Sequence, residues 1–402
     1  MKRVLLPILS LILSLPFFIQ AQNLQKQLQT QMIMAEAGDV IEIPAGNYQF
    51  DGTLSMDEKK DITIKGAGMD KTILSFKGQT KGAEGLRITN SENIRVEGLT
   101  VQDAKGDAIK TMEVNGISFV DVRTEWTGKP KASNGAYGLY PVSCERVLID
   151  KCEAIGASDA GIYVGQSSHI IVRNSRAYHN VAGIEIENST HAEVYNCISE
   201  ENTGGILVFD LPDLPKKKGG EVRVYNNKIL NNNYKNFAPK GNIVAQVPPG
   251  TGVMILATSD VEIFENTITD NRTVPVTVVS YYMTELPIKD EVYDPYPKAI
   301  YFHDNTFTRS KKWRPTFRNK IGLLLYREFK KNVPDIVYDG IMDEGSMDDK
   351  GKLTDRYKIC IQEKEGTTFA NLDAENNFEN IKTDIKHHDC SREPIKEVKL
   401  GK

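Results

Sequence analysis

The sequence contains few cysteines, few aromatic residues and no excess of basic charge. Its 402 residues include 5 Cys and 2 Trp, and no two cysteines form a Cys-x-x-Cys pair. Without such a pair, the sequence supports neither a structural zinc site nor covalently attached haem, and we predict no cofactor and no metal. The formal net charge is −4, which argues against nucleic acid as a partner because binding phosphates requires a basic surface.

Long apolar runs are also scarce, and the one candidate lies at the N-terminus. There Lys2 and Arg3 precede an apolar stretch and a small-residue cleavage site at Ala21, which is the arrangement of a signal peptide over residues 1–21. Two prolines interrupt the stretch, and it is shorter than the roughly 20 residues of a membrane-spanning helix. We therefore predict an exported protein (periplasmic, cell-surface or secreted) with no transmembrane segment in the mature chain.

One sequence pattern is repeated four times between residues 138 and 210. Its copies begin at Gly138, Gly161, Gly183 and Gly205, which are 23, 22 and 22 residues apart. A fixed period in the twenties indicates a solenoid, and each copy holds short strands of alternating apolar residues. The leucine framework of a leucine-rich repeat is missing. The pattern predicts an all-β fold, a right-handed parallel β-helix, in which equivalent residues of successive coils form ladders.

The ends of the periodic region predict the limits of this solenoid. Residues 22–37 are typical of an amphipathic helix, which we expect to cap the first coil. The β-helix is predicted over residues 38–312. Residues 313–402 are predicted to hold a second capping helix, at 317–331, followed by an irregular tail.

Three insertions interrupt the later coils, at residues 209–220, 234–250 and 281–298, and together they carry eight prolines. Insertions in a solenoid emerge at its bends, so insertions that share a bend cover the same face. Prolines make such loops stiff, which suits a wall beside a binding site. Loops without any role in function are the alternative.

Outward-facing positions of the first strand in each coil predict a functional strip. One ladder is expected to run through Arg87, Lys110, Tyr140, Tyr163, Glu185, Leu207 and Met254, and a parallel one through Thr89, Met112, Val142, Gly165, Glu187, Phe209 and Leu256. Cations are thus followed by tyrosines, carboxylates and apolar groups. This order suits an elongated groove for an acidic polysaccharide, because sugar rings stack on aromatic groups and sugar carboxylates pair with cations. An ordinary solvated face of the solenoid is the alternative.

Carboxylates and tyrosines of the strip are the candidates for proton transfer. Glu185 and Glu187 lie two residues apart on one strand, and a carboxylate pair can supply the acid and the base of glycoside cleavage. The predicted catalytic residues are Tyr137, Tyr140, Tyr163, Glu185, Glu187 and Asp210. The predicted substrate-binding residues are Arg87, Lys110, Arg123, Trp126 and Lys240.

The five cysteines divide into two groups. Cys360 and Cys390 lie 30 residues apart in the C-terminal region, and in an exported protein they are candidates for a disulfide. Such a bond would stabilise the fold by roughly 3–4 kcal/mol. Cys144, Cys152 and Cys197 lie in the repeat and are expected to be small buried apolar residues.

Two stretches resemble known β-helix families. Residues 38–48 and 62–68 resemble the opening of pectate-lyase-like proteins, which implies the fold. The segment Tyr137-Gly138-Leu139-Tyr140-Pro141-Val142, followed by Asp159-Ala160-Gly161, resembles the catalytic coils of alginate (mannuronan) C5-epimerases.

Of the four epimerase catalytic positions compared, this sequence retains one and differs at three. Tyr137 corresponds to the epimerase tyrosine, whereas Tyr140, Val142 and Gly165 stand where those enzymes have an aspartate, a histidine and an aspartate. Epimerisation requires a base and an acid on opposite faces of the sugar ring. Because valine can be neither, epimerisation of that type is not expected here.

A resemblance over most of the chain is carried by five segments: 125–128, 134–141, 182–188, 204–212 and 236–242. The terminal motifs at 371–374 and 388–390 extend it. They are similar to a bacterial family of exported parallel β-helix repeat proteins whose activity is not established. Its members are often encoded beside a c-type-cytochrome-like protein, so the resemblance implies export and such a partner.

Two hypotheses for function follow. The first is an enzyme that binds and cleaves or modifies an acidic polysaccharide, as a lyase or glycoside hydrolase. The second is a non-catalytic binding or scaffold protein of the cell envelope that acts with the cytochrome-like partner. A flat apolar patch around Leu207, Phe209, Met254 and Leu256 would favour the second hypothesis.

Overall fold

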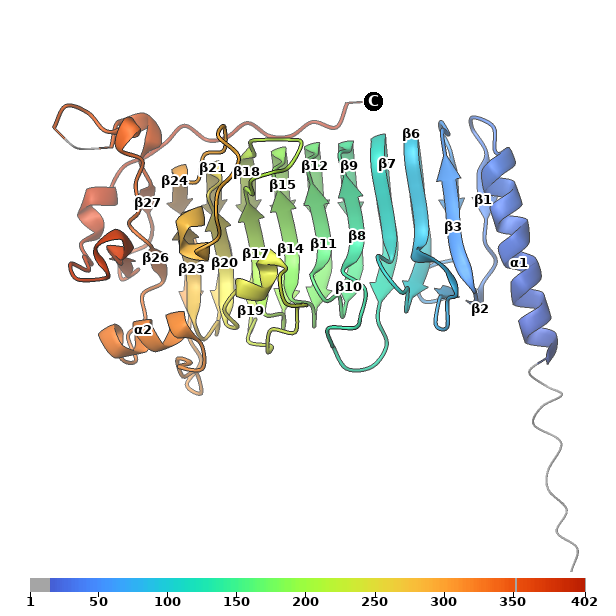
Figure 1. The fold of residues 1–402 in the computed structure, drawn as a ribbon, viewed down its shortest axis with the longest axis horizontal. Helices are drawn as coiled ribbons and strands as arrows, with labels where there is room; N and C mark the ends of the chain where they lie inside the picture. Colours follow the sequence, from blue (N-terminus) through green and yellow to red (C-terminus); the bar gives the residue numbers. More distant parts are fainter. Residues whose placement is uncertain (1–14, 351–352, 402) are drawn as a thin grey trace, which may run out of the picture.

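The protein is a solenoid of parallel strands, shown by a computed structural model that describes residues 15–350 and 353–401 (Figure 1). Each regular coil contributes three short strands, which pair in parallel with those of the neighbouring coils. The strands therefore lie on three faces, named here sheets 1, 2 and 3. The predicted β-helix fold is confirmed.

Sheet 1 contains the first strand of each coil. Its members are β3 (Gly52–Asp57), β8 (Tyr137–Val142), β11 (Ala160–Gly165), β14 (Ala182–Glu187), β17 (Gly204–Phe209), β20 (Thr251–Leu256), β23 (Val274–Val279), β26 (Ile336–Tyr338) and β28 (Phe369–Asn371). Two long strands, β6 (Lys81–Gln102) and β7 (Ile109–Glu125), pass through all three sheets.

Sheets 2 and 3 complete the coils. Sheet 2 adds β1 (Val40–Glu42), β4 (Thr63–Lys65), β9 (Glu145–Asp150), β12 (Ser168–Arg173), β15 (Thr190–Tyr195), β18 (Gly220–Tyr225), β21 (Ser259–Phe264), β24 (Lys298–His303) and β27 (Cys360–Gln362). Sheet 3 adds β2 (Gly46–Gln49), β5 (Thr72–Ser75), β10 (Glu153–Ile155), β13 (Arg176–Tyr178), β16 (Ile198–Glu200), β19 (Lys228–Leu230), β22 (Thr267–Thr269) and β25 (Thr306–Thr308).

The core is a stack of apolar ladders inside the coils. Ile162, Ile184 and Ile206 are register partners on β11, β14 and β17, and all three are fully buried. Each loses contact with water on every side because the coil encloses it. The predicted alternation of apolar and outward residues is therefore confirmed for these strands.

Helix α1 (Leu15–Met34) covers the first coil, where its Leu28 and Met32 join the core. Most of the predicted signal peptide, residues 1–14, lies outside the described residues. Within 15–350 and 353–401, neither helix has the length and apolar character needed to cross a bilayer.

The C-terminal region differs from the predicted irregular tail. Helix α2 (Lys320–Phe329) forms as predicted, with the Asn319 side chain accepting a hydrogen bond from the Gly322 N–H. Leu325 of this helix packs on the outer side of sheet 1, against Val274 and Val337. The helix therefore does not cover the open end of the last coil, where the cap was expected. The solenoid also continues past residue 312, because β26, β27 and β28 pair in register with earlier coils or each other. The 3-10 helices of this region are Glu344–Ser346, Asp355–Tyr357, Ala374–Asn376 and Ile385–His388.

Buried asparagines form a ladder at one bend of the coils. Asn180, Asn202, Asn232 and Asn271 are stacked, and the side-chain oxygen of each later residue accepts the backbone N–H of the one before. The Asn202 amide also donates to the carbonyl of Ala177. The ladder thus satisfies backbone groups that a bend would otherwise bury without partners.

Substituting Asn202 by Ala is expected to lower the free energy of unfolding by about 1–3 kcal/mol, because the buried N–H of Asn180 loses its acceptor. Urea unfolding followed by circular dichroism measures the change. The exposed Asn115, whose side chain accepts from Arg146, is the control, and Asn115→Ala should change stability by less than about 0.5 kcal/mol. Equal losses in the two variants would contradict the role of the ladder.

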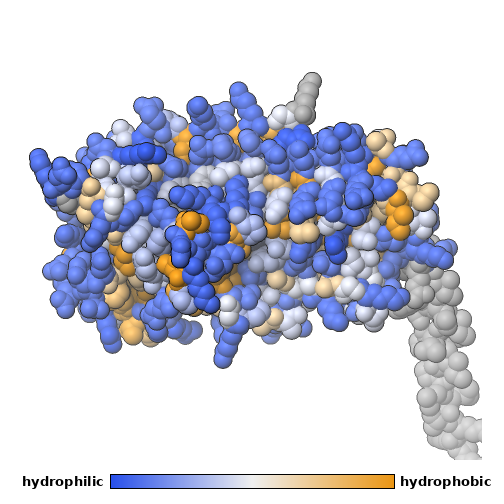
Figure 2. Space-filling model, turned by 45° about the horizontal axis from the view of Figure 1, so that its top comes forward, coloured by the Kyte–Doolittle hydropathy of each residue, from blue (hydrophilic) through white to orange (hydrophobic). Residues whose placement is uncertain are grey.

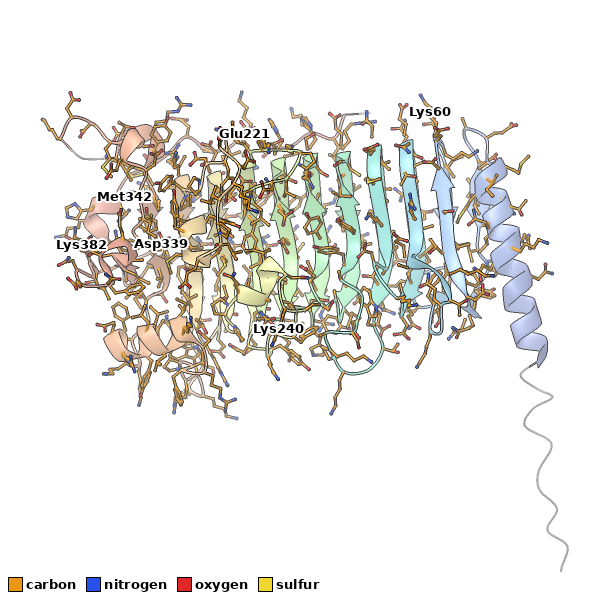
Figure 3. The ribbon with its side chains drawn as sticks, in the orientation of Figure 1. Lys60, Glu221, Lys240, Asp339, Met342 and Lys382 are labelled. Atoms are coloured by element: carbon orange, nitrogen blue, oxygen red, sulfur yellow. A yellow bond between two sulfur atoms is a disulfide. The ribbon has the colours of Figure 1, made fainter. Side chains whose placement is uncertain are left out.

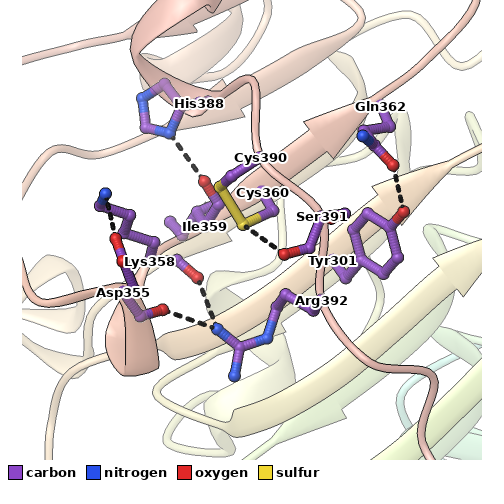
Figure 4. Close-up of a disulfide and its surroundings, with 10 residues drawn as sticks. All are labelled: Tyr301, Asp355, Lys358, Ile359, Cys360, Gln362, His388, Cys390, Ser391 and Arg392. Atoms are coloured by element: carbon purple, nitrogen blue, oxygen red, sulfur yellow. Dashed lines mark hydrogen bonds and ion pairs between the residues drawn. A yellow bond between two sulfur atoms is a disulfide. The ribbon is translucent and has the colours of Figure 1, made fainter.

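A disulfide joins Cys360 on β27 to Cys390, as predicted (Figure 4). The other three cysteines are free and buried, which is also as predicted. Directly after the bond, Arg392 donates to the carbonyls of Asp355 and Lys358 at 3.2 and 3.4 Å. The disulfide therefore fixes the start of the last segment, residues 391–401, which we name the strap.

The strap runs back along sheet 2 toward earlier coils (Figure 1). The backbone N–H of Ile395 donates to the Glu262 carboxylate at 3.2 Å, and that of Val398 donates to the Glu193 carboxylate at 3.1 Å. Glu193 and Glu262 are two coils apart with Arg223 between them. Two coil spacings amount to about 10 Å, the length of about three extended residues, so the strap matches the ladder.

Candidate active site

The order of side chains along the outer side of sheet 1 is the predicted one. Lys110 pairs with Tyr140, Tyr163 pairs with Glu185, and Glu187 pairs with Phe209. The exposure of the strip differs from the prediction, however. Arg87 is exposed and Lys110 half-buried, whereas Tyr163 and Glu185 are only 4% and 1% exposed. The predicted open groove is therefore limited to one end of the strip.

The insertions at 234–250 and 281–298 cover the rest of the strip, whereas the sequence predicted only a wall beside it. The Asn242 side chain, from the insertion at 234–250, donates to the Asp159 carboxylate at 2.8 Å. The Tyr293 hydroxyl, from the insertion at 281–298, donates to the backbone carbonyl of Asp210 at 2.6 Å. The first insertion closes on itself, since the Gly219 N–H donates to the Asp210 carboxylate.

The apolar patch expected for a scaffold protein is not at the surface. Leu207, Phe209 and Leu256 are at most 3% exposed, and Met254 is 9% exposed. They pack against residues of the insertions, including Val247 and others in one buried cluster. Figure 2 shows a mostly hydrophilic face with small scattered apolar areas. The feature that would have favoured the scaffold hypothesis is thus absent from the described surface of this strip.

Three tyrosines form the boundary between the open end and the covered part. The ring centroids of Tyr137, Tyr140 and Tyr163 are 4.3 to 5.0 Å apart, so each ring contacts the other two. Tyr137 and Tyr140 are half-buried and reach the surface, whereas Tyr163 lies beneath them. The Lys110 ammonium lies 4.9 Å from the centroid of the Tyr140 ring, within the range of a cation–π contact.

Buried carboxyls lie behind these rings. The Tyr163 hydroxyl donates to Glu187 with an O–O distance of 2.5 Å. Burial raises the pKa of Glu187 to about 7, against the hydrogen bond from Tyr163, which lowers it. Burial likewise raises the pKa of Asp159 to about 7, while hydrogen bonds from Asn242 and Tyr137 oppose the shift. Carboxyls poised near neutral pH can both accept and release a proton there.

Glu185 is the most deeply buried carboxyl of the group. Its Oε2 has no hydrogen-bond partner among the described residues. Burial raises its pKa well above the ordinary value, and the charge of Glu187 adds to the rise. The rise favours the protonated form of Glu185, which spares the site a second buried charge.

The tyrosine hydroxyls are held in their protonated form. Burial raises the pKa of Tyr137 and of Tyr163 well above the usual range, and it raises the pKa of Tyr140 to about 12. Nearby carboxylates add to each shift. The tyrosines are thus proton donors in the resting site, and Glu187 and Asp159 are the acceptors.

Two predicted binding residues lie away from this site. Trp126 is 5% exposed in the core, where its indole N–H donates to the Ala104 carbonyl at 2.7 Å. Arg123 belongs to sheet 3, where Glu153 and Asp70 neutralise it at 2.7 and 2.8 Å. The structure therefore does not bring these two side chains to the strip.

Lys240 and Asp210, two further predicted site residues, differ in exposure. Lys240 is exposed on the insertion at 234–250, at the edge of the molecule in Figure 3. Asp210 follows β17 and is 5% exposed. Burial raises its pKa to about 7, opposed by the Gly219 N–H. Asp210 therefore belongs to the covered part of the strip.

Asp107 and Asp159 were not among the predicted site residues. Asp159 directly precedes β11, and Asp107 lies two residues before β7, so both sit at the same bend as Tyr137. Burial raises the pKa of Asp107 to about 6, and Lys110 opposes the shift. The sequence does contain a signal for them, because an aspartate precedes the first strand in each of these two coils. The prediction missed it because it considered only positions inside the strands.

The structure also explains two departures from the epimerase pattern. A side chain at Gly165 would overlap the Tyr163 ring, so no aspartate fits there. Val142 is 7% exposed, and its aliphatic side chain has no group that can donate or accept a proton. Among the residues that the structure describes, no group of three His, Cys, Asp or Glu side chains is arranged to hold a metal ion.

The raised pKa values predict that the protein is less stable at alkaline pH. A carboxyl whose folded pKa is raised stabilises the fold fully below its unfolded pKa, and this contribution is lost as pH rises through the folded pKa. For Glu187 and Asp159 the loss falls between about pH 4 and pH 7. We expect the free energy of unfolding to be a few kcal/mol lower at about pH 8 than at about pH 5.

Glu187→Gln should reduce this pH dependence, because the amide does not titrate. The exposed Glu113 is the matched control, and Glu113→Gln should retain the full dependence. Urea unfolding of the three proteins at both pH values provides the test. A wild-type protein equally stable at both values would show that these carboxyls are ionised in the folded state.

Comparison with known families supports the fold. A family model described as a right-handed β-helix region matches residues 84–288, about half of the chain. No curated protein matches the sequence.

Three solved structures illustrate the similarity. The A-module of mannuronan C-5 epimerase AlgE4 of Azotobacter vinelandii is 16% identical with a TM-score of 0.52, over 86% of this chain and 90% of that chain. An alginate lyase of Paenibacillus sp. is 14% identical with a TM-score of 0.47, over 71% and 93%. DFA-IIIase of Arthrobacter chlorophenolicus A6 is 12% identical with a TM-score of 0.46, over 83% and 90%. At these identities the similarity concerns the fold alone.

Proposed function

This chain belongs to the right-handed β-helix family, and we propose that it cleaves an acidic polysaccharide by proton transfer at the three tyrosines and the carboxyls behind them. The observation that carries the proposal is the contact of Tyr137, Tyr140 and Tyr163 over carboxyls with pKa values of about 7. Buried titratable groups with strongly shifted pKa values are typical of catalytic sites.

The open end of the strip supports an acidic sugar as the substrate. Arg87 is exposed there and Lys110 is half-buried beside Tyr140. A uronate ring can stack on Tyr140 while its carboxylate pairs with Lys110. The buried carboxyls lie behind the tyrosine rings, so they do not face the sugar carboxylate directly.

The half-buried Tyr137 is the proposed proton-transfer group that contacts the sugar. In a lyase reaction a base removes the proton next to the uronate carboxylate, and an acid protonates the oxygen that leaves, so that an unsaturated sugar end forms. Tyr137 first passes its hydroxyl proton to the Asp159 carboxylate, which hydrogen-bonds it, and the phenolate that forms removes the proton next to the uronate carboxylate. The re-formed hydroxyl then protonates the leaving oxygen, and Asp159 returns its proton to Tyr137. Burial raises the pKa of Tyr137 and the charge of Glu187 adds to the rise, so ionised Glu187 opposes the first step.

The proposal also includes export. A disulfide between Cys360 and Cys390 is typical of proteins in oxidising compartments, which supports removal of a signal peptide near Ala21. The cytochrome-like partner implied by the family resemblance stays a prediction. Finding the full-length chain with reduced cysteines in the cytoplasm of its host would contradict export.

A panel of polyuronates and neutral glycans tests the reaction. Purified protein should release unsaturated ends, detected by ultraviolet absorbance, from at least one polyuronate. Lys110→Ala should raise KM for that polymer by about ten- to a hundredfold, since a charged contact contributes roughly 1.5–3 kcal/mol. Lys228, exposed on sheet 3, is the control. Release of saturated reducing ends alone would assign a hydrolase, and no release from any polymer would contradict the proposal.

A further inference from the structure

Two apolar clusters lie on the outer side of sheet 1, and they do not merge. The first includes Phe209, Met254 and Leu256, together with residues of the insertions. The second includes Leu325 of α2 and Val337 of β26. Both clusters are separate from the core inside the coils.

A cavity of about 100 Å³ lies where the two clusters face each other. Its wall combines Phe209, Met254 and Leu256 from the first cluster with Leu325 and Val337 from the second. Val279 of β23 and Met283 of the 3-10 helix Tyr281–Thr284 add to the apolar part of the wall, and Gln246, Thr277 and Thr284 are its uncharged polar residues.

The charged group in the wall is already engaged with the backbone. Asp339, labelled in Figure 3, accepts hydrogen bonds from the N–H of Ser280 at 2.6 Å and of Ile341 at 3.0 Å. Its two oxygens therefore have partners outside the cavity. A negatively charged ligand would be repelled by this carboxylate, whereas an uncharged one would meet apolar side chains.

Protein interiors are close-packed and contain few voids larger than a water molecule. A cavity lined by apolar side chains takes up apolar molecules in preference to water, and a volume of about 150 Å³ is enough for benzene. The insertions, α2 and β26 build this cavity, so it is not a by-product of stacking regular coils. Met254 and Met283 add unbranched, adaptable side chains, which are suited to ligands of varied shape.

The cavity continues the strip that carries the candidate active site. Glu187 pairs with Phe209 on the next coil, and Phe209 pairs with Leu256 on the coil after that. The proposed point of cleavage, at Tyr137 and Tyr140 on β8, lies three coils before β17, which carries Phe209. At about 4.8 Å per coil, the cavity wall therefore begins about 14 Å from the point of cleavage.

We propose that this cavity binds an uncharged alkyl group of about four carbons, carried by the molecule on which the active site acts. The carrier rests on the proposed function, whereas binding of the apolar group does not. The substrate class then becomes a glycan with a short apolar substituent at a distance from the cleaved unit.

Titration of the full-length protein with n-butanol tests the binding site. Calorimetry should show saturable binding to the wild type, and the midpoint of thermal unfolding should rise with n-butanol but not with an equal concentration of ethanol. Val279→Phe fills the cavity and should weaken n-butanol binding at least about tenfold. Val292→Phe makes the same change at a residue that is 62% exposed and should bind like the wild type.

A second variant keeps the test informative if Val279→Phe does not fold. Met283→Ala enlarges the cavity and should shift the preferred alcohol from n-butanol to a longer one. Glu187→Gln should bind n-butanol unchanged, which separates this site from the proposed chemistry. Absence of saturable binding to the wild type, or equal binding by Val279→Phe, would overturn the proposal even if glycan cleavage were demonstrated.

Discussion

Substituting Tyr137 by Phe is expected to lower turnover of the polyuronate by at least about a hundredfold. The phenyl ring retains the contacts with Tyr140 and Tyr163, at 4.3 and 4.7 Å between centroids, so the shape of the site is kept. Only the hydroxyl is lost, and a positioned proton donor contributes roughly 10²–10⁴ to the rate. Turnover is measured by the ultraviolet absorbance of unsaturated ends, and KM should change little.

Tyr282→Phe provides the control, since Tyr282 is 46% exposed on the insertion at 281–298. It should retain wild-type turnover. Glu187→Gln adds a second readout, because it should remove the limb of the pH–rate profile near pH 7 that the Glu187 carboxyl causes. A Tyr137→Phe protein with normal turnover would mean that another group protonates the leaving oxygen.

Substituting Ile184 by Asp is expected to prevent soluble folding. Ile184 is fully buried between Ile162 and Ile206 of the neighbouring coils. An unpaired carboxylate in this place costs several kcal/mol, which is a large part of the roughly 5–15 kcal/mol that stabilises a folded domain. Solubility, circular dichroism and limited proteolysis of the expressed variant measure the outcome.

Ile171 offers a matched control on the other side of a strand. It is only half-buried, on the outer side of β12 in sheet 2, so Ile171→Asp should fold with a loss of roughly 1 kcal/mol or less. If Ile184→Asp were soluble with an unchanged unfolding midpoint, Ile184 could not face the core.

Both expectations rest on a register that the sequence predicted well. The 22-residue period placed Tyr163 beside Glu185 and Glu187 beside Phe209, and the structure pairs them so. A repeat fixes its own register, because slipping one strand by a residue would turn every apolar side chain outward. Side chains at equal repeat positions are therefore predictable from spacing alone.

The covering of the strip could not be predicted in the same way. It depends on contacts between distant residues, such as Asn242 with Asp159 and Tyr293 with Asp210, each 83 residues apart. No period relates these residues, and prolines indicate stiff loops without giving their direction. The burial of Tyr163 and Glu185 therefore needed the structure, and so did the shifted pKa values that follow from burial.

The C-terminal strands escaped prediction for a related reason. Strand β26 pairs with β23 although 56 residues separate Val279 from Ile336, and α2 lies between them. Across an interval of this length, a search for a 22-residue period does not detect the next coil. Only the three-residue strands themselves, such as Ile336–Tyr338, return to the ladder.

The strap gives the chain a late step of assembly that depends on the order of synthesis. Glu262 and Glu193 are made before the residues whose N–H groups they accept, Ile395 and Val398, which follow them by 133 and 205 residues. A nascent chain emerges from its N-terminus, so these coils can stack while both carboxylates still lack those donors. The flank of sheet 2 is completed only after the strap has been made and Cys390 has reached Cys360.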